Sequence, residues 1–365
     1  MKPWFKPYID KENYKKSINN LIVSDELTMG NSVRELESFI AKELDIKYVC
    51  LTTSGTSALL ISSIIINYDL KNRKRKRKKV ICTNLTWVAT INPFILQDFE
   101  IFLVDTLDDS DEVNFDELNK SIIKIKPDVV LLVNLNGNCL YNRKFDLLKK
   151  KLKFVVVEDS AQSLFIKDIK GRFSGTRYDI GCFSLGITKP FNMIYGGFCV
   201  TNSKKIYKKM VAIRNNGVPE IKSNKKLELA TMVGLNLRPS NAHTVLGLIN
   251  IKKYKKILNQ IKKIHEYYCE NLKNKKIKIV KYPHHQNYCY VQALVSNRRK
   301  FMIFAKENNI QIHTGIRCLS ESNNNLNVIS SKNSINFSKK SVRLPCGPGY
   351  KIKDIDKFCK IFTKY

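Results

Sequence analysis

The chain has 365 residues and a formal net charge of +32, and its hydrophobic fraction of 43% is ordinary for a soluble globular protein. This length suggests two domains or one large domain. The N-terminus has no apolar segment of the secretory type, and the longest apolar stretch, Ala58 to Ile66, is too short to span a bilayer. We therefore expect a cytoplasmic protein with no membrane partner. The ten cysteines form no Cys-x-x-Cys pair, which argues against a zinc site or a disulfide framework.

Most of the positive charge is scattered among Asn and Ile residues, which is typical of a solvated surface. One dense basic block covers Lys71 to Lys79. It could be a nuclear-localisation signal or a polyanion-binding patch, or a solvated loop that joins a helix to the next strand. Because no aromatic residues interleave with it, the sequence does not favour nucleic-acid binding. A nucleic-acid-associated protein nevertheless stays open as an alternative.

Seven short hydrophobic runs in the first two hundred residues predict β-strands, and helix-length segments lie between most of them. The alternation of strands and helices is typical of an α/β domain with a mostly parallel sheet. The predicted strands are Lys47–Thr52, Val80–Thr83, Ile101–Asp105, Val129–Asn134, Phe154–Glu158, Cys182–Leu185 and Gly197–Thr201. The predicted helices are Ser57–Asp69, Phe115–Ile125 and Arg143–Leu152.

The pattern changes near residue 240. A long helix-like stretch covers Ala242–Leu272, and the polar tract Ser320–Asn336 predicts a loop. A strand candidate and two further helices follow the long stretch, at Tyr288–Leu294, Arg299–Asn308 and Ile352–Phe362. We therefore expect a large domain of residues 1–240, including an N-terminal arm, and a smaller α+β domain of residues 241–365.

The segment Ser54-Gly55-Thr56-Ser57 follows the first predicted strand and opens a helix. Free backbone N–H groups and the helix dipole make such a point an anion site, and Gly55 lets the backbone approach a phosphate closely. A serine N-cap explains the segment equally well. A serine nucleophile lacks support, because all five histidines lie at or beyond His243.

Asp159 ends a predicted buried strand, where an unpaired carboxylate is costly. One partner would be the protonated pyridine nitrogen of pyridoxal 5′-phosphate (PLP). The ion pair would keep the pyridine ring an electron sink. An N-cap or an internal salt bridge remains open as the alternative. Gln162 could donate a hydrogen bond to the ring hydroxyl of that cofactor or decorate a turn.

Lys189 lies at a strand-to-loop boundary after Ser184 and Thr188. It could be an ordinary surface lysine, or a Schiff-base lysine whose pKa is lowered by burial beside a cofactor. Trp87 is one of only two tryptophans, and it could stack on a pyridine face or pack in the core.

In this order and at these spacings, these segments resemble the sugar-nucleotide aminotransferase family, also called the DegT/DnrJ/StrS family, of fold-type-I PLP enzymes. The resemblance covers nearly the whole chain. It rests on Asp25–Gly30, Val33–Glu37, Ser54–Leu59, Thr86–Thr90, Glu158–Gln162, Lys170–Arg172, Asp179–Ser184, Thr188–Lys189, Gly196–Gly197, Gly234–Arg238 and Arg343–Gly349.

The resemblance implies a mostly parallel seven-stranded sheet and a role for each candidate. Lys189 would bind the cofactor covalently and carry the proton, while Asp159 would pair with the pyridine nitrogen. The remaining cofactor contacts would be Gln162 at the ring hydroxyl, Trp87 on the ring face, Gly55, Thr56, Ser57 and Ser184 at the phosphate, and Asn236 reaching that phosphate from a second subunit. The active site would therefore be shared within a homodimer.

The implied reaction takes an amino group from an amino acid, for which we expect L-glutamate, and holds it as pyridoxamine phosphate. The group then passes to a keto carbon of a UDP-, dTDP- or GDP-linked deoxyhexose, which yields an amino sugar for polysaccharide biosynthesis. Lys189 separates the chain from the family's dehydratase branch, in which a histidine replaces the lysine.

The chain also departs from the family pattern, mostly where a sugar nucleotide should bind. The departures are Ile194-Tyr195 before Gly196, a missing histidine near Asn134–Gly137, the segment Ser163–Phe165, and Ile316–Leu319. An inactive or regulatory protein that binds PLP or a sugar nucleotide therefore remains the alternative function.

Overall fold

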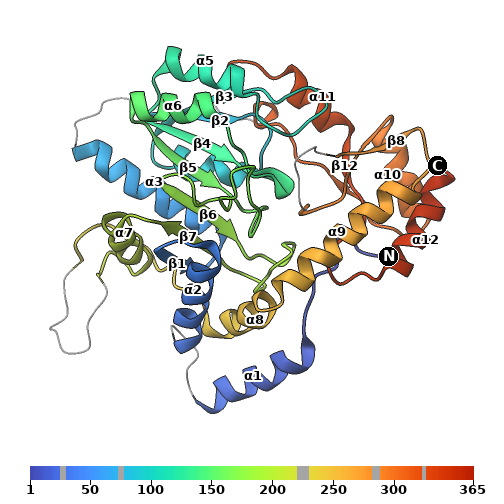
Figure 1. Cartoon of the computed structure of the whole chain (residues 1–365), viewed down its shortest axis with the longest axis horizontal. Coiled ribbons are helices and arrows are strands. Elements are labelled where there is room, and N and C mark those ends of the chain that lie inside the picture. Colours follow the sequence, from blue (N-terminus) through green and yellow to red (C-terminus); the bar gives the residue numbers. More distant parts are fainter. Residues whose placement is uncertain (25–29, 73–77, 220–229, 282–287, 323–325) are drawn as a thin grey trace.

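The computed structural model describes residues 1–24, 30–72, 78–219, 230–281, 288–322 and 326–365. Residues 73–77 of the basic block and residues 25–29 of the first matching segment lie outside these ranges. The described residues form a large α/β unit and a smaller unit built on a second sheet, and both chain termini lie beside the smaller unit (Figure 1).

The large sheet has eight strands in the order β1-β7-β6-β5-β4-β2-β3-β11. Only β7 runs antiparallel to its neighbours, so the sheet is mostly parallel. The strands are β1 (Tyr48–Thr52), β2 (Lys78–Thr83), β3 (Phe99–Val104), β4 (Val129–Val133), β5 (Val155–Asp159), β6 (Ile180–Ser184), β7 (Gly197–Thr201) and β11 (Asn327–Val328). The central strand β4 is buried at every position, as a parallel strand covered on both faces requires.

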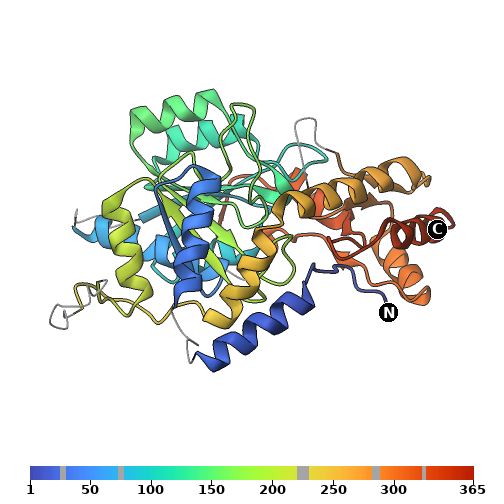
Figure 2. The same ribbon diagram turned by 60° about the horizontal axis from the view of Figure 1, so that its bottom comes forward.

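Helices cover both faces of this sheet (Figure 2). One face packs against α3 (Gly55–Asn72), α4 (Asn92–Ile95) and α7 (Lys204–Arg214). The other face packs against α5 (Phe115–Ile125) and α6 (Arg143–Leu152) near β4, and against α2 (Asn31–Leu44) and α8 (Asn241–Ile251) near β1. The first helix, α1 (Lys11–Val23), lies at the periphery and contacts α8. The large unit is therefore a three-layer α/β/α structure.

The smaller sheet is antiparallel in the order β10-β12-β9-β8. Its strands are β8 (Ile277–Ile279), β9 (Gln292–Val295), β10 (His313–Thr314) and β12 (Ser341–Arg343), and its helices are α9 (Tyr254–Asn271), α10 (Arg298–Glu307), α11 (Lys332–Lys340) and α12 (Ile352–Thr363). The core under this sheet also contains Phe5 from the N-terminal arm. Leu248 and Ile251 of α8 pack instead with the large sheet. The domain boundary after residue 240 stays a prediction.

The predicted fold class is confirmed, and the structure adds an eighth strand to the seven expected. That strand, β11, lies within the tract Ser320–Asn336, for which the sequence predicts a loop, and the helix α11 begins in the same tract and ends at Lys340. Residues 323–325 lie outside the described ranges. The loop prediction is wrong because a distant residue stabilises the helix. Both carboxylate oxygens of Asp105 accept 2.8 Å hydrogen bonds from the first-turn N–H groups of Asn333 and Ser334. The long helix-like stretch Ala242–Leu272 is helical and consists of two helices, α8 and α9.

Within the described residues, no helix combines the length and the apolar character needed to cross a bilayer.

Candidate active site

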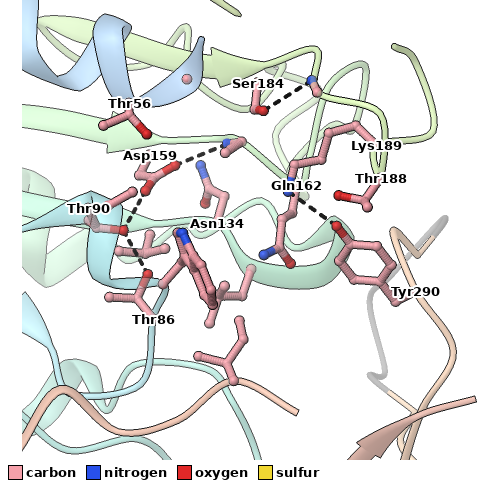
Figure 3. Close-up of a pocket in the computed structure, with 18 of the residues that line it drawn as sticks. Thr56, Thr86, Thr90, Asn134, Asp159, Gln162, Ser184, Thr188, Lys189 and Tyr290 are labelled. Carbon is pink, nitrogen blue, oxygen red and sulfur yellow. Dashed lines mark hydrogen bonds between the residues drawn. The ribbon is translucent and has the colours of Figure 1, made fainter. Parts of the chain in front are cut away.

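A cavity of about 340 Å³ lies at the carboxyl ends of the parallel strands, where α/β proteins bind their ligands. Seven of the nine candidate residues line it, and most are visible in Figure 3. They are Gly55, Thr56, Trp87, Asp159, Gln162, Ser184 and Lys189. The smaller unit closes the cavity with Tyr290, His313 and Arg343, and the N-terminal arm adds Trp4.

The amino end of α3 forms one wall of the cavity. Its first residue, Gly55, lies so close to β6 that an added Cβ would meet the Cβ of Ser184 at 2.8 Å and its Cα at 3.2 Å. The hydroxyl of Ser184 faces the same wall and accepts a 3.3 Å hydrogen bond from Gly186 N–H. Because α3 has 18 residues, its dipole and leading N–H groups favour an anion at this point.

Replacing Gly55 with alanine should displace α3 from β6, because the new methyl group has no room beside Ser184. We expect the affinity for PLP to fall about 10-fold or more and the unfolding free energy to fall by about 1–3 kcal/mol. Spectroscopic titration with PLP and thermal unfolding measure the two effects. The contrasting variant Ser57→Ala should change PLP affinity much less, and an equal loss in both variants would contradict this account.

Asp159 ends β5 and is buried at the floor of the cavity. One carboxylate oxygen accepts a 2.6 Å hydrogen bond from Thr90, and the other accepts a 3.1 Å bond from Ala161 N–H. Thr90 in turn bonds Thr86 at 2.9 Å, so that a short polar chain fixes the carboxylate (Figure 3). Burial raises the pKa of Asp159, although these bonds and Lys189 oppose the shift. No cation of the described residues forms an ion pair with this carboxylate, which leaves it suited to a cationic ligand group.

Lys189 enters the cavity from the loop after β6, and its Nζ donates a 3.2 Å hydrogen bond to the hydroxyl of Tyr290 (Figure 3). Burial by itself lowers the pKa of Lys189, but the net shift is opposite to the lowered pKa that the sequence suggests for a Schiff-base lysine. The attraction of Tyr290 and Cys289 and the hydrogen bond to Tyr290 outweigh burial, so that the pKa of the free amine lies above its ordinary value. Tyr290 therefore holds the amine in one position inside the cavity.

Gln162 and Trp87 lie on the cavity wall as expected. The side-chain oxygen of Gln162 accepts a 3.0 Å hydrogen bond from Asn136 N–H, which fixes the side chain and leaves its amide nitrogen as the remaining donor. Trp87 is 61% exposed, so it is not a core tryptophan. The exposed indole face beside a cavity is available for stacking on a flat ligand.

Two candidates lie outside the cavity. The hydroxyl of Ser57 bonds the hydroxyls of Thr53 and Ser54, and its N–H donates to Ser54 Oγ at 3.0 Å. Asn236 is exposed, and its side-chain oxygen accepts a 3.1 Å hydrogen bond from Arg238. The role of Asn236 toward a second subunit stays a prediction.

The sequence alone does not identify the closing residues Trp4, Tyr290 and His313. It places Arg343 and Thr90 in matching segments without giving either a role. The segment Thr86–Thr90 belongs to the resemblance, and a threonine three residues after Trp87 is a signal for a polar group close to the same ligand. No local pattern assigns these residues to the cavity, because they come from the arm and the second sheet and meet Lys189 only in the folded chain.

The arrangement fits PLP in three independent ways. A buried carboxylate without a cationic partner suits the pyridine nitrogen, a helix end closed against Ser184 suits the phosphate, and an amine inside the same cavity suits the aldehyde. Among the described residues no cluster of His, Cys, Asp and Glu could hold a metal ion.

Comparisons with known proteins agree with this geometry. A UDP-4-amino-4,6-dideoxy-N-acetyl-beta-L-altrosamine transaminase of Campylobacter jejuni is 26% identical over 365 residues, which cover 94% of this chain and 92% of that protein. A GDP-4-keto-6-deoxy-D-mannose 3-dehydratase of Escherichia coli O55:H7 is 26% identical over 276 residues, 71% of this chain and 70% of that one. The aminotransferase PseC of Helicobacter pylori shares the fold, with a TM-score of 0.87 over 99% of this chain and 98% of that one at 20% identity.

A family comparison covers nearly the whole chain and agrees with these relatives. Residues 8–363 match the DegT/DnrJ/EryC1/StrS aminotransferase family, so the match includes every candidate residue and both sheets. The chain belongs to the DegT/DnrJ/EryC1/StrS aminotransferase family.

Proposed function

We propose that the protein is a PLP-dependent aminotransferase that moves an amino group from L-glutamate to a keto carbon of a nucleotide-linked deoxyhexose. The observation that carries this proposal is the meeting of Lys189, the unpaired carboxylate of Asp159 and the amino end of α3 in one cavity. An amine, a carboxylate and an anion site are the protein groups that a PLP reaction needs around the cofactor.

Different residues of the cavity would bind different groups of the cofactor. Gly55, Thr56 and Ser184 would hold the phosphate at the amino end of α3, and Asp159 would pair with the pyridine nitrogen. The free amide nitrogen of Gln162 would donate to the ring hydroxyl. When bound, PLP supplies an electron sink for the electrons released at the substrate carbon.

Lys189 is placed to act as both base and acid. Its Nζ would accept the proton that leaves the α-carbon of the donor and would return a proton to a carbon of the cofactor. The reaction with the acceptor requires the same proton transfers in the reverse order. Tyr290 would orient Nζ through its hydroxyl, which is buried and lies 3.2 Å away. The walls formed by Trp4, His313 and Ile316 would limit water at the reacting atoms.

The names of the relatives support a nucleotide sugar as acceptor. The Campylobacter jejuni relative is named for a UDP-linked amino sugar, and the Escherichia coli relative for a GDP-linked keto sugar. We propose the same substrate class for this chain, with UDP, dTDP or GDP as the nucleotide, and the net charge of +32 favours a diphosphate-bearing ligand. Because Lys189 stands where the dehydratase branch is expected to carry histidine, amino transfer is favoured over dehydration.

We further propose a cytoplasmic homodimer with shared active sites. Asn236 is exposed and lies outside the cavity of its own chain, which leaves it available to a second copy.

A product assay tests the proposal. The purified protein would be incubated with PLP, L-glutamate and UDP-, dTDP- and GDP-linked keto-deoxyhexoses, and the products analysed by mass spectrometry. We expect an aminated nucleotide sugar together with an equal amount of 2-oxoglutarate. Sugar deoxygenation without amination would instead favour a dehydratase, and no turnover of any amino donor would contradict the proposal.

A further inference from the structure

One buried cation in the cavity has no charged partner. Arg343 ends β12, is 6% exposed and lines the cavity beside Lys189. Its Nε makes no hydrogen bond, and no carboxylate of the described residues pairs with it. Because a buried charge is costly without a counter-ion, such a group is explained most simply by a ligand that carries the opposite charge.

The neighbours of Arg343 are aromatic rings rather than anions. Its Cζ lies 4.0 Å from the ring centroid of Tyr290 and 5.8 Å from that of Trp4. The neighbouring strand places His313 opposite Arg343, and the His313 ring lies 4.5 Å from Trp4. Burial and the nearby guanidinium both lower the pKa of His313, so its imidazole favours the neutral form. Ring faces attract a guanidinium, but they leave its in-plane N–H groups without acceptors.

Arg343 and Lys189 meet at one side chain. Tyr290 accepts the hydrogen bond from Lys189 at its hydroxyl, and its ring face contacts Arg343. A small molecule whose reacting carbon lies at Lys189 would therefore have its adjoining group near Arg343. In an amino acid, the group bonded directly to the reacting carbon is a carboxylate, and a guanidinium binds a carboxylate in a planar, two-bond geometry.

We propose that Arg343 binds a carboxylate of the amino-acid donor. This inference rests on the proposed aminotransferase function and gives it a donor subsite, walled by Trp4, Tyr290 and His313. Glutamate carries two carboxylates that could provide this charge, the α-carboxylate beside the reacting carbon and the γ-carboxylate farther away. The acceptor sugar uses the same cavity after the donor has left.

Amide analogues of the donor test the proposal. The donor half-reaction, without acceptor, would be followed through the loss of the cofactor's visible absorption. Three amino acids would be compared: L-glutamate, L-isoglutamine, which lacks the α-carboxylate, and L-glutamine, which lacks the γ-carboxylate. We expect Arg343→Met to slow the half-reaction with L-glutamate about 30-fold or more. The half-reaction with whichever amide the wild type uses more slowly should proceed at nearly the same rate in the variant, because that amide lacks the carboxylate that Arg343 would bind. Arg343→Lys should fall between the wild type and Arg343→Met, and the exposed arginine variant Arg299→Met is the matched control.

Two further measurements do not depend on turnover. The affinity of the PLP-loaded protein for glutarate, measured by calorimetry, should fall about 30-fold or more in Arg343→Met. The unfolding midpoint of the same variant without ligand should shift upward or stay unchanged, because an unpaired buried cation is removed. A structural role for Arg343 would instead lower the midpoint, so the two roles move this measurement in opposite directions.

Each outcome decides the question. Loss of discrimination against L-isoglutamine assigns the α-carboxylate to Arg343, and loss of discrimination against L-glutamine assigns the γ-carboxylate. If Arg343→Met keeps the wild-type rates with all three amino acids, or weakens only the later reaction with the nucleotide sugar, the proposal is overturned. A wild-type protein that reacts with none of the three amino acids would instead refute the proposed aminotransferase function itself.

Discussion

Replacing Lys189 with alanine is expected to abolish amino transfer and the visible absorption of the bound cofactor. The amine of Lys189 is the one lysine nitrogen that lines the cavity among the described residues. Its loss removes both the covalent attachment of PLP and the group that carries the proton, and we expect turnover to fall on the order of 10⁴-fold. An assay of 2-oxoglutarate formation and an absorbance spectrum measure the two effects.

The matched control for this variant is Lys263→Ala, which removes an exposed lysine of α9. It should leave turnover and the spectrum unchanged. Arginine at position 189 keeps the positive charge, but we expect it to fail like alanine, because a guanidinium that stays protonated cannot accept the substrate proton. Normal transamination by either variant of Lys189 would contradict the proposed function.

Replacing Asp159 with asparagine is expected to lower turnover about 10²- to 10³-fold, because the buried partner of the pyridine nitrogen loses its charge. The shape of the site should persist, since the asparagine oxygen can still accept from Ala161 N–H and the amide can donate to Thr90. Steady-state kinetics with saturating PLP measure the loss. Asp159→Glu keeps the charge but adds a methylene group in a buried site, so we do not expect it to restore the wild-type rate.

The same variant makes a prediction about stability and pH in the cofactor-free protein. Burial raises the folded-state pKa of Asp159 above the ordinary value of 3.8. Between these two pKa values the unfolded state binds fewer protons than the folded state, so the contribution of Asp159 to stability falls as the pH rises. Asp159→Asn should therefore gain unfolding free energy relative to the wild type on going from pH 3.8 toward neutral pH. Urea unfolding of both proteins across this pH range measures the difference in unfolding free energy. A relative gain in the stability of Asp159→Asn as the pH falls would contradict the prediction.

The large unit could be predicted from the sequence because its signals are local. The seven predicted strands all form, since continuous hydrophobic runs bounded by polar residues mark strands buried on both faces. The helices α5 and α6 begin and end at the predicted residues, because Asn114 and Asn142 cap their first turns with side-chain hydrogen bonds. The cavity residues on this unit follow from the same logic, since Asp159 and Ser184 are the last residues of their strands.

The distal part could not be predicted to the same degree, because its structure depends on contacts between residues far apart in the chain. The helix α11 needs Asp105, which lies more than 200 residues before it. Tyr290 reaches Lys189 because the side-chain oxygen of Asn136 accepts a 2.7 Å hydrogen bond from its N–H, which ties the smaller unit to the large one. Arg343 faces the cavity through the register of β12 with its neighbours, which no short pattern specifies. The donor subsite therefore emerges only from the folded chain.

Binding of PLP through Lys189 can be tested by an absorbance spectrum of the purified protein with PLP, recorded before and after the addition of L-glutamate. We expect a visible band that depends on Lys189 and that disappears when the amino acid gives up its amino group. A protein that shows no visible band after PLP is added would contradict the claim that this cavity binds PLP through Lys189.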